Sequence, residues 1–189
     1  LRHNGPFNYS AINNAAVRET HSSFLCSLNN DIEIHDPKWL STLVNQAKRD
    51  DVGAVGPMLL YPDGSIQHAG VVLGIGGGAA HAHRNVLPDA EGYFSRHALP
   101  QFVSAVTGAC LVVKRERFDA AGGFDEENFP VAFNDVDLCM KLANLGFNSL
   151  YEPRARLVHH ESKTRGDDRD AAGAHRLAQE LAALKRIWH

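Results

Sequence analysis

The chain has 189 residues, of which 44% are hydrophobic and 22% charged, and its formal net charge is −3. This length suits one domain with a substantial core, and the absence of a basic stripe argues against nucleic acid as a partner. Since no apolar run approaches the roughly 20 residues that cross a bilayer, we expect no transmembrane segment.

Helical and extended patterns alternate along the chain, which predicts an α/β fold. Asp36 and Pro37 are typical of an N-cap and a first helical position, and Asn134 is expected to cap a later helix. Residues 74–100 have few apolar anchors, so we expect a long, mobile loop there. The predicted elements, in chain order, are a helix over 9–20, a strand over 23–28, a helix from 36, a strand over 52–60, an extended segment over 66–73, the loop over 74–100, an extended segment over 102–113, helices over 115–121 and 134–145, a strand over 155–159 and a helix over 171–188.

The cysteines and the loop histidines form no metal-ligand motif. Cys26, Cys110 and Cys139 all stand in apolar runs, which predicts core thiols in a reducing compartment. We therefore expect the protein to be located in the cytoplasm, which includes the inner face of the membrane. His81 and His83 are expected to be surface residues.

A polar cluster, Asn29–Asn30–Asp31, follows the apolar run that ends at Leu28. A carboxylate at the carboxyl end of a buried strand lies where α/β sheets bind ligands. One carboxylate with open coordination positions suits Mg²⁺ or Mn²⁺ shared with a diphosphate. The same residues would also suit a simple polar turn.

Two further candidates are aspartates at a helix start and histidines at a strand end. Asp135 and Asp137 are spaced so that they point about 200° apart on a helix, so one faces a cleft while the other caps the helix or faces solvent. The helix dipole favours the ionised form of Asp135, as a general base requires. Alternation sends His159 and His160 to opposite faces, so one imidazole reaches a given metal ion. Ordinary helix-start acidity and a structural histidine are the alternatives.

In order, these motifs resemble a family 2 glycosyltransferase of the GT-A fold, in the bacterial O-antigen and rhamnosyl-transferring branch. The resemblance covers about residues 5–166 and implies a mixed sheet flanked by helices. The matching segments are Phe7–Ser10 with Asn13–Asn14, Leu28–Asp31, Val52–Pro57, Tyr61–Gly64, Gln67–Gly70, Thr107–Cys110, Gly122–Glu126, Asn134–Cys139 and His159–Ser162.

The resemblance implies a role for each matched position. Asp135 would be the base of a single displacement that inverts the anomeric configuration. Asp31 would bind Mg²⁺ or Mn²⁺ on a nucleotide-diphosphate sugar, with His159 beside the metal and His160 as the fallback. The implied donor residues are Asn29, Asn30, Asp31, Gly108 and Ala109. The implied acceptor residues are Gly123, Phe124, Asp125, Glu126 and Asn134. The acceptor would be a saccharide or a lipid-linked saccharide of a cell-surface polysaccharide or O-antigen.

The chain departs from the family pattern at its start, because family members begin with two strand–helix units that contact the nucleotide. We therefore expect residues 1–189 to be the C-terminal portion of one catalytic domain, with little or no transferase activity alone. An unpaired sheet edge would favour pairing with another copy. Two alternatives are a non-catalytic carbohydrate- or protein-binding module on the same scaffold and a metal-dependent phosphohydrolase.

Overall fold

The computed structural model describes residues 5–160 and 171–188. Seven strands form one mixed sheet in the order β1–β8–β3–β9–β2, with β4 added to β3 and β7 added to β9. Strands β3 and β9 run parallel, and the other pairings in this sheet are antiparallel. These strands are β1 (Phe24–Leu28), β2 (Ile32–Ile34), β3 (Val52–Leu60), β4 (Ile66–His68), β7 (Gln101–Val103), β8 (Cys110–Lys114) and β9 (Asn148–His159).

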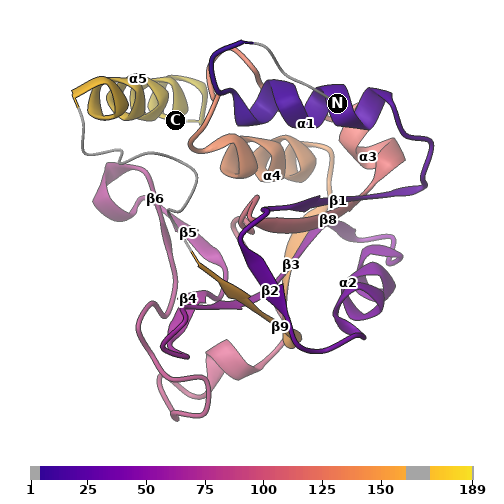
Figure 1. Cartoon of the computed structure of the whole chain (residues 1–189), viewed down its shortest axis with the longest axis vertical. Coiled ribbons are helices and arrows are strands. Elements are labelled where there is room, and N and C mark those ends of the chain that lie inside the picture. Colours follow the sequence, from indigo (N-terminus) through magenta and orange to yellow (C-terminus); the bar gives the residue numbers. More distant parts are fainter. Residues whose placement is uncertain (1–4, 161–170, 189) are drawn as a thin grey trace.

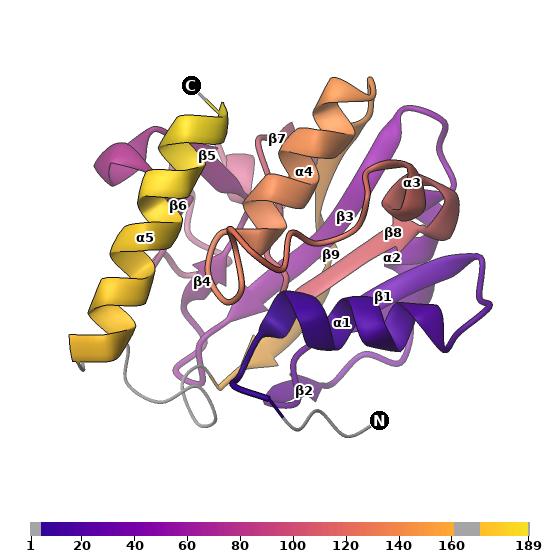
Figure 2. The same cartoon turned by 90° about the horizontal axis from the view of Figure 1, so that it is seen from above.

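Helices cover the sheet on both faces, as Figures 1 and 2 show. The helices α1, α4 and α5 lie side by side over one face, with α3 beside them, and α2 lies on the other. A small second sheet pairs β5 (Val71–Leu73) with β6 (Ala79–His81). The helices are α1 (Tyr9–Arg18), α2 (Trp39–Ala47), α3 (Arg115–Ala120), α4 (Asn134–Asn144) and α5 (Ala171–Trp188), with 3-10 turns η1 (Ile75–Gly77) and η2 (Arg96–Ala98). The predicted mixed α/β sheet flanked by helices is confirmed.

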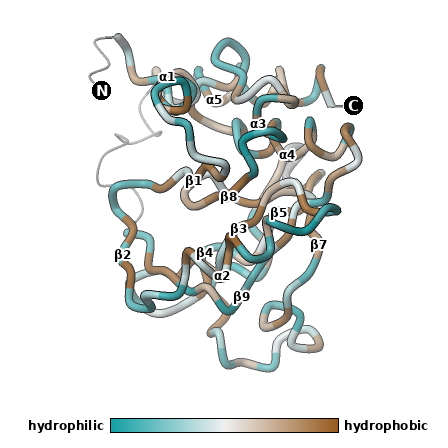
Figure 3. The backbone as a smooth tube through the Cα atoms, turned by 90° about the vertical axis from the view of Figure 1, so that its right-hand side faces the viewer, coloured by the Kyte–Doolittle hydropathy of each residue, from teal (hydrophilic) through white to brown (hydrophobic). Residues whose placement is uncertain are grey.

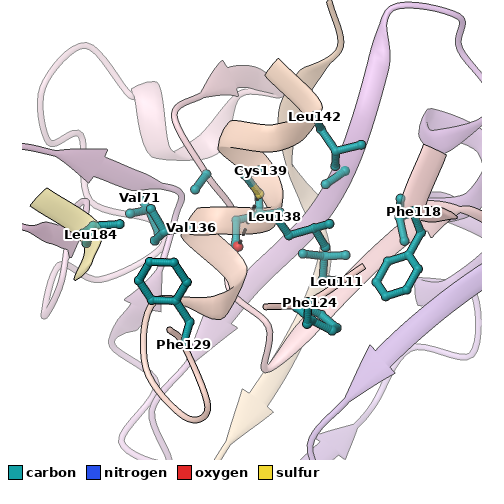
Figure 4. Packing of buried hydrophobic residues seen from close by; sticks show 14 of the residues in the cluster. Val71, Leu111, Phe118, Phe124, Phe129, Val136, Leu138, Cys139, Leu142 and Leu184 are labelled. Carbon is teal, nitrogen blue, oxygen red and sulfur yellow. Dashed lines mark hydrogen bonds between the residues drawn. The ribbon is translucent and has the colours of Figure 1, made fainter. Parts of the chain in front are cut away.

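The two larger of three hydrophobic clusters hold these layers together, because alternate side chains of each strand point to opposite faces. On the α4 face, Leu111, Phe129, Leu138 and Leu142 are fully buried together with residues of α5, as Figure 4 shows. On the other face, α2 packs against the alternate residues of β3 and β8. The hydropathy-coloured tube of Figure 3 is accordingly brown along β8 and β3. No helix of residues 5–160 or 171–188 is long and apolar enough to cross a membrane.

The sheet register brings three polar segments to one edge. In the β1–β8 pair, Leu28 at the end of β1 lies opposite Cys110 at the start of β8. In the β2–β9 pair, Ile32 lies opposite His159 at the end of β9. The segments 29–31 and 107–109 and the end of β9 therefore meet at this edge of the sheet.

The last strand is longer than expected. The sequence predicts a strand over 155–159, whereas β9 begins at Asn148. Pro153 and its charged neighbours hide this strand from pattern analysis, since proline is tolerated in sheets chiefly at edges and bulges. A register shift opposite Pro57 and Met58 of β3 accommodates it, and the buried carboxylate of Glu152 accepts hydrogen bonds from neighbouring side chains.

Both predicted helix caps are wrong, by two residues at α2 and by one residue at α4. Helix α2 begins at Trp39, and the side chain of Asp36 accepts a hydrogen bond from Lys38 N in the turn before it. Helix α4 has Phe133 at the N-cap, in the left-handed region at φ 57°, so Asn134 is the first helical residue. Local capping preferences were outweighed by tertiary contacts of the segment that precedes α4.

Three other expectations need correction. Cys26 is exposed because it lies on β1 at the edge of the sheet, whereas Cys110 and Cys139 are buried as predicted. The predicted loop contains the strand β6 and two 3-10 turns, and the short strand β2 was missed. His81 and His83 are partly buried rather than on the open surface.

A buried histidine makes the stability of this fold depend on pH. His68 is fully buried, with its Nδ1 2.8 Å from His81 Nδ1 and its Nε2 accepting from Gly70 N. Burial first, and then the charge of His81, lowers the pKa of His68 well below its usual value of 6.5. Below pH 6.5 His68 therefore becomes protonated in the unfolded chain but stays neutral in the folded chain.

We predict that the free energy of unfolding falls as the pH drops below 6.5, by up to about 1.4 kcal/mol per pH unit for this group. Urea denaturation at several pH values from 7.5 to 5 measures the slope. His68→Gln should flatten it, whereas His21→Gln, on an exposed residue, should not. An unchanged slope in His68→Gln would refute the assignment.

Candidate active site

The first half of the candidate site is a corner between the end of β1 and the end of β9. Asp31 Oδ1 lies 3.1 Å from His159 Nε2, and both side chains are about nine-tenths buried. The backbone carbonyl of Asp31 accepts a hydrogen bond from His160 N, so the two segments are joined next to the corner. Asn29 Nδ2 lies 3.3 Å from the same His159 nitrogen. The alternation predicted for the two histidines is observed, since His160 turns to the exposed Glu33.

Gln67 determines the tautomer of His159. Its Oε1 lies 2.7 Å from His159 Nδ1, and its side chain is 4% exposed. An amide oxygen only accepts hydrogen bonds, so the proton of a neutral His159 is on Nδ1. The Nε2 lone pair then faces Asp31. Such outer partners orient metal-binding histidines in known sites.

The arrangement fits a divalent cation. Asp31 Oδ1 is buried without a hydrogen bond of good geometry among the described residues, and it faces another acceptor, His159 Nε2. Octahedral bonds of 2.0–2.1 Å place neighbouring ligand atoms roughly 3 Å apart, which matches the observed separation. Within residues 5–160 and 171–188, no three His, Cys, Asp or Glu side chains gather to hold a metal. The remaining ligands would come from substrate and water.

The second half of the candidate site surrounds Gly108. Asp135 Oδ2 accepts a hydrogen bond from Gly108 N at 2.8 Å, and Asp135 Oδ1 accepts one from Val136 N at 2.8 Å. Both carboxylate oxygens are therefore held by backbone N–H donors at the first turn of α4. Asp135 is only partly buried.

Tyr9 of α1 holds Gly108 from the other side. Its hydroxyl donates to Gly108 O at 2.6 Å. A Cβ atom on Gly108 would lie 3.2 Å from the Tyr9 hydroxyl, 3.4 Å from Asn134 Oδ1 and 3.4 Å from Asp135 Cβ. Glycine is therefore the residue that lets these three polar side chains surround the backbone closely.

One backbone hydrogen bond connects the two halves. Asn29 N donates to Ala109 O at 2.9 Å, while the side chain of Asn29 reaches His159. Because Ala109 follows Gly108, the contacts run without a break from the base candidate Asp135 to the metal corner. The sequence-predicted residues at these positions are thus brought together.

The predicted acceptor residues have structural partners here. Phe124 is 3% exposed and packs in the α4 core. Asp125 accepts hydrogen bonds from Glu127 N and from the backbone and side chain of Asn128. Glu126 and the backbone of Phe124 bind Asn14 of α1. Gly123 has φ 69°, a left-handed conformation that favours glycine. Their contact with an acceptor stays a prediction.

Asp137 is neither a cap nor exposed to solvent, so that expectation is wrong. Its side chain is buried, 2.6 Å from Lys141 Nζ, and accepts from Trp188 Nε1 at 3.1 Å. Burial raises the pKa of Asp137, while Lys141 lowers it. The predicted donor residue Asn30 is exposed in the turn after β1. Glu161 and Ser162 of the last matching segment lie outside the described residues.

Sequence reasoning missed Gln67 and Tyr9 as site residues. Both belong to segments that match the family pattern, Gln67–Gly70 and Phe7–Ser10, and that match was the available signal. Their side chains have no distinctive chemistry in isolation. Their partners lie 92 and 99 residues away in the chain.

We predict that Tyr9→Phe lowers the free energy of unfolding by about 1 kcal/mol, since a typical hydrogen bond contributes that much. Urea denaturation measures the difference. Tyr93→Phe is the matched control on a residue that is 65% exposed, and its effect should stay within about 0.5 kcal/mol. Equal effects of both substitutions would argue against the bond from Tyr9 to Gly108.

The sequence is similar to several curated proteins, although no protein-family model matches it. It is 49% identical over 188 residues to an uncharacterized protein of Sinorhizobium fredii, covering 100% of this chain and 21% of that protein. It is 43% identical over 169 residues to the O-antigen biosynthesis protein RfbC of Myxococcus xanthus, covering 86% of this chain and 13% of the relative. It is 34% identical over 142 residues to the N-acetylglucosaminyl-diphospho-decaprenol L-rhamnosyltransferase of Mycobacterium tuberculosis, covering 70% and 45%. The chain therefore spans less than half the length of each of these relatives.

Solved structures support the fold. A mannosyltransferase from Pyrobaculum calidifontis, in complex with GDP-Man and Mn²⁺, matches with a TM-score of 0.64 at 20% identity, over 100% of this chain and 47% of that one. GalNAc-T7 with UDP, GalNAc and Mn²⁺ matches with the same TM-score at 15% identity, over 85% and 32%. The chain thus has the fold of the GT-A glycosyltransferases and is a homologue, over part of their length, of an O-antigen biosynthesis protein and a rhamnosyltransferase.

Proposed function

We propose that the chain carries the metal site and the catalytic base of an inverting, metal-dependent glycosyltransferase. The donor is a nucleotide-diphosphate sugar, and the acceptor is a hydroxyl of a saccharide or lipid-linked saccharide in cell-surface polysaccharide or O-antigen synthesis. The observation that carries the proposal is the unbroken set of contacts from Asp31 and His159 to Asp135. A donor diphosphate and an acceptor hydroxyl need these two kinds of group near each other.

In this proposal Asp31 and His159 hold Mg²⁺ or Mn²⁺. When bound, the cation neutralises the negative charge that grows on the departing diphosphate. Asn29 has an amide where the family pattern has a carboxylate, and here it orients His159. Asn30 and the backbone of Gly108 and Ala109 line the donor side. The acceptor side is the segment from Gly123 to Glu126 together with Asn134.

Asp135 receives the proton of the acceptor hydroxyl in this proposal. Its carboxylate is held by Gly108 N and Val136 N, and each oxygen keeps a lone pair for a further hydrogen bond. As the hydroxyl attacks the anomeric carbon, the proton moves to the carboxylate and the diphosphate leaves from the opposite face. One displacement of this kind inverts the anomeric configuration.

We further propose that residues 1–189 form the C-terminal portion of a single catalytic domain in the cytoplasm, at the inner face of the membrane where a lipid-linked acceptor is used. Because the chain spans less than half of its curated relatives, transfer by these residues alone is expected to be weak. Substantial sugar transfer by the isolated chain would contradict this expectation.

The metal site is tested by thermal unfolding with Mn²⁺, alone and with UDP or dTDP. Binding to the native state at about 100 times Kd stabilises by about 2.7 kcal/mol, so Tm should rise by roughly 5–10 °C in a domain of this size. Asp31→Asn should abolish the rise, while Asp89→Asn, on an exposed side chain, should leave it intact. No rise in the wild-type chain would favour a non-catalytic binding module, and repeating the titration on a form extended at the N-terminus would show whether further chain is required.

The base is tested by Asp135→Asn, in this chain and in any longer form that contains it. An amide oxygen still accepts from Gly108 N but cannot take a proton, so the transfer rate should fall about 10²–10⁴-fold with Tm nearly unchanged. Asp119→Asn, on an exposed residue of α3, is the control. A rate within threefold of wild type would remove Asp135 from this role.

A further inference from the structure

The position of Asp135 depends on the segment that enters α4. This lead-in segment, Phe129–Phe133, ends at Phe133 in the left-handed conformation, and no side chain of the N-cap closes the helix start. Asn134 Nδ2 donates to Val131 O at 2.7 Å, which ties the first residue of α4 back to the segment. The direction in which α4 starts is therefore determined by whatever holds the lead-in segment.

Helix α1 holds one side of it. Ser10 is fully buried, its Oγ donates to Phe129 O at 2.5 Å, and its backbone N donates to Pro130 O at 3.3 Å. The neighbouring Tyr9 holds Gly108, so α1 touches both the lead-in segment and the partner of Asp135. In Figure 4 the ring of Phe129 lies beneath Val136 of α4.

Glu180 of α5 holds the other side. Its carboxylate is 2% exposed and accepts hydrogen bonds from two consecutive backbone groups, Val131 N at 3.1 Å and Ala132 N at 2.7 Å. Hydrogen bonds to an ionised acceptor are about twice as strong as neutral ones. Arg176, one turn earlier on α5, lies 3.9 Å from the same carboxylate.

Other contacts make α5 a firm support. Trp188 Nε1 donates to Asp137 of α4, and Arg186 donates to Asn128 at 2.8 Å, just before the lead-in segment. Ala183 and Leu184 are buried in the shared core. Helix α5 thus docks along α4 independently of Glu180, and Figure 2 shows the two helices side by side.

We infer that Glu180 is a positioning residue for Asp135: by binding Val131 N and Ala132 N, it sets the start of α4 so that Asp135 stays within hydrogen-bond distance of Gly108 N. Its importance for transfer rests on the proposed function, because Asp135 is the base only in that proposal. A purely structural role would be to fasten α5 to the domain. The two roles differ in what happens at Gly108, whose N–H donates to Asp135, whereas Glu180 accepts from Val131 N and Ala132 N.

The test is amide hydrogen exchange in Glu180→Gln and Glu180→Ala, with Gln179→Ala as the control on the exposed side of the same turn. A Trp39→Phe background makes the indole emission report on Trp188, and so on the docking of α5. We expect the Gly108 amide to exchange roughly tenfold faster or more in Glu180→Ala, less so in Glu180→Gln, which keeps one amide oxygen, and not in the control. The Trp188 emission should stay unchanged. If Glu180→Ala does not fold, Glu180→Gln alone carries the comparison.

Two results would overturn the inference. In the first, exchange accelerates at Val131 and Ala132 while Gly108 stays protected. In the second, Gly108 loses protection only together with a red shift of the Trp188 emission, because the effect would then come from undocking of α5. An active form should in addition lose kcat with KM nearly unchanged. If a form extended at the N-terminus transfers no sugar, the proposed function fails, yet the exchange result at Gly108 still decides the role of Glu180.

Discussion

The parallel pairing of β3 with β9 is the constraint on which the rest of this domain depends. This pair lies at the centre of the sheet. The last residue of β9, His159, lies at the same end of the sheet as the end of β1 and the start of β8. Position 56 of β3 requires glycine, because a Cβ atom on Gly56 would lie only 2.6 Å from Val106 Cβ. The segment before Thr107 can therefore pack tightly on β3, and that brings Gly108 into the site.

The site is built from acceptors that face one another. Asp31 Oδ1 and His159 Nε2 converge at 3.1 Å in a largely buried corner, an arrangement that is costly without a proton or a cation between them. Gln67 excludes one way of relieving this cost in the neutral state, since it engages the Nδ1 proton. A proton on His159 Nε2, or the divalent cation of the proposed function, would remove this cost.

The helices α1, α4 and α5, which cover one face of the sheet, have different roles. Helix α4 carries Asp135, and its buried side supplies much of the core. Helices α1 and α5 each bury a polar residue, Ser10 and Glu180, against the backbone that enters α4. A buried polar group without a hydrogen bond costs a free energy of several kcal/mol. The hydrogen bonds of Ser10 and Glu180 therefore constrain the position of the backbone that enters α4.

The sequence by itself determined the elements and the order of the motifs. The apolar run that ends at Leu28, the alternation of His159 and His160, and the placement of Asp135 in the first turn of a helix all follow from local periodicity, and the structure agrees with each. Together with the family resemblance they predicted the mixed α/β fold and the three side chains on which the proposed chemistry depends.

Only the tertiary structure decided which groups support them. Gln67 meets His159 across 92 residues of chain, Tyr9 meets Gly108 across 99, and Glu180 meets Val131 across 49. The N-terminal half of β9, with its proline, and the left-handed Phe133 were likewise set by long-range contacts. Local patterns report which face of an element is buried, but the partner of a buried polar group is chosen by packing between distant segments.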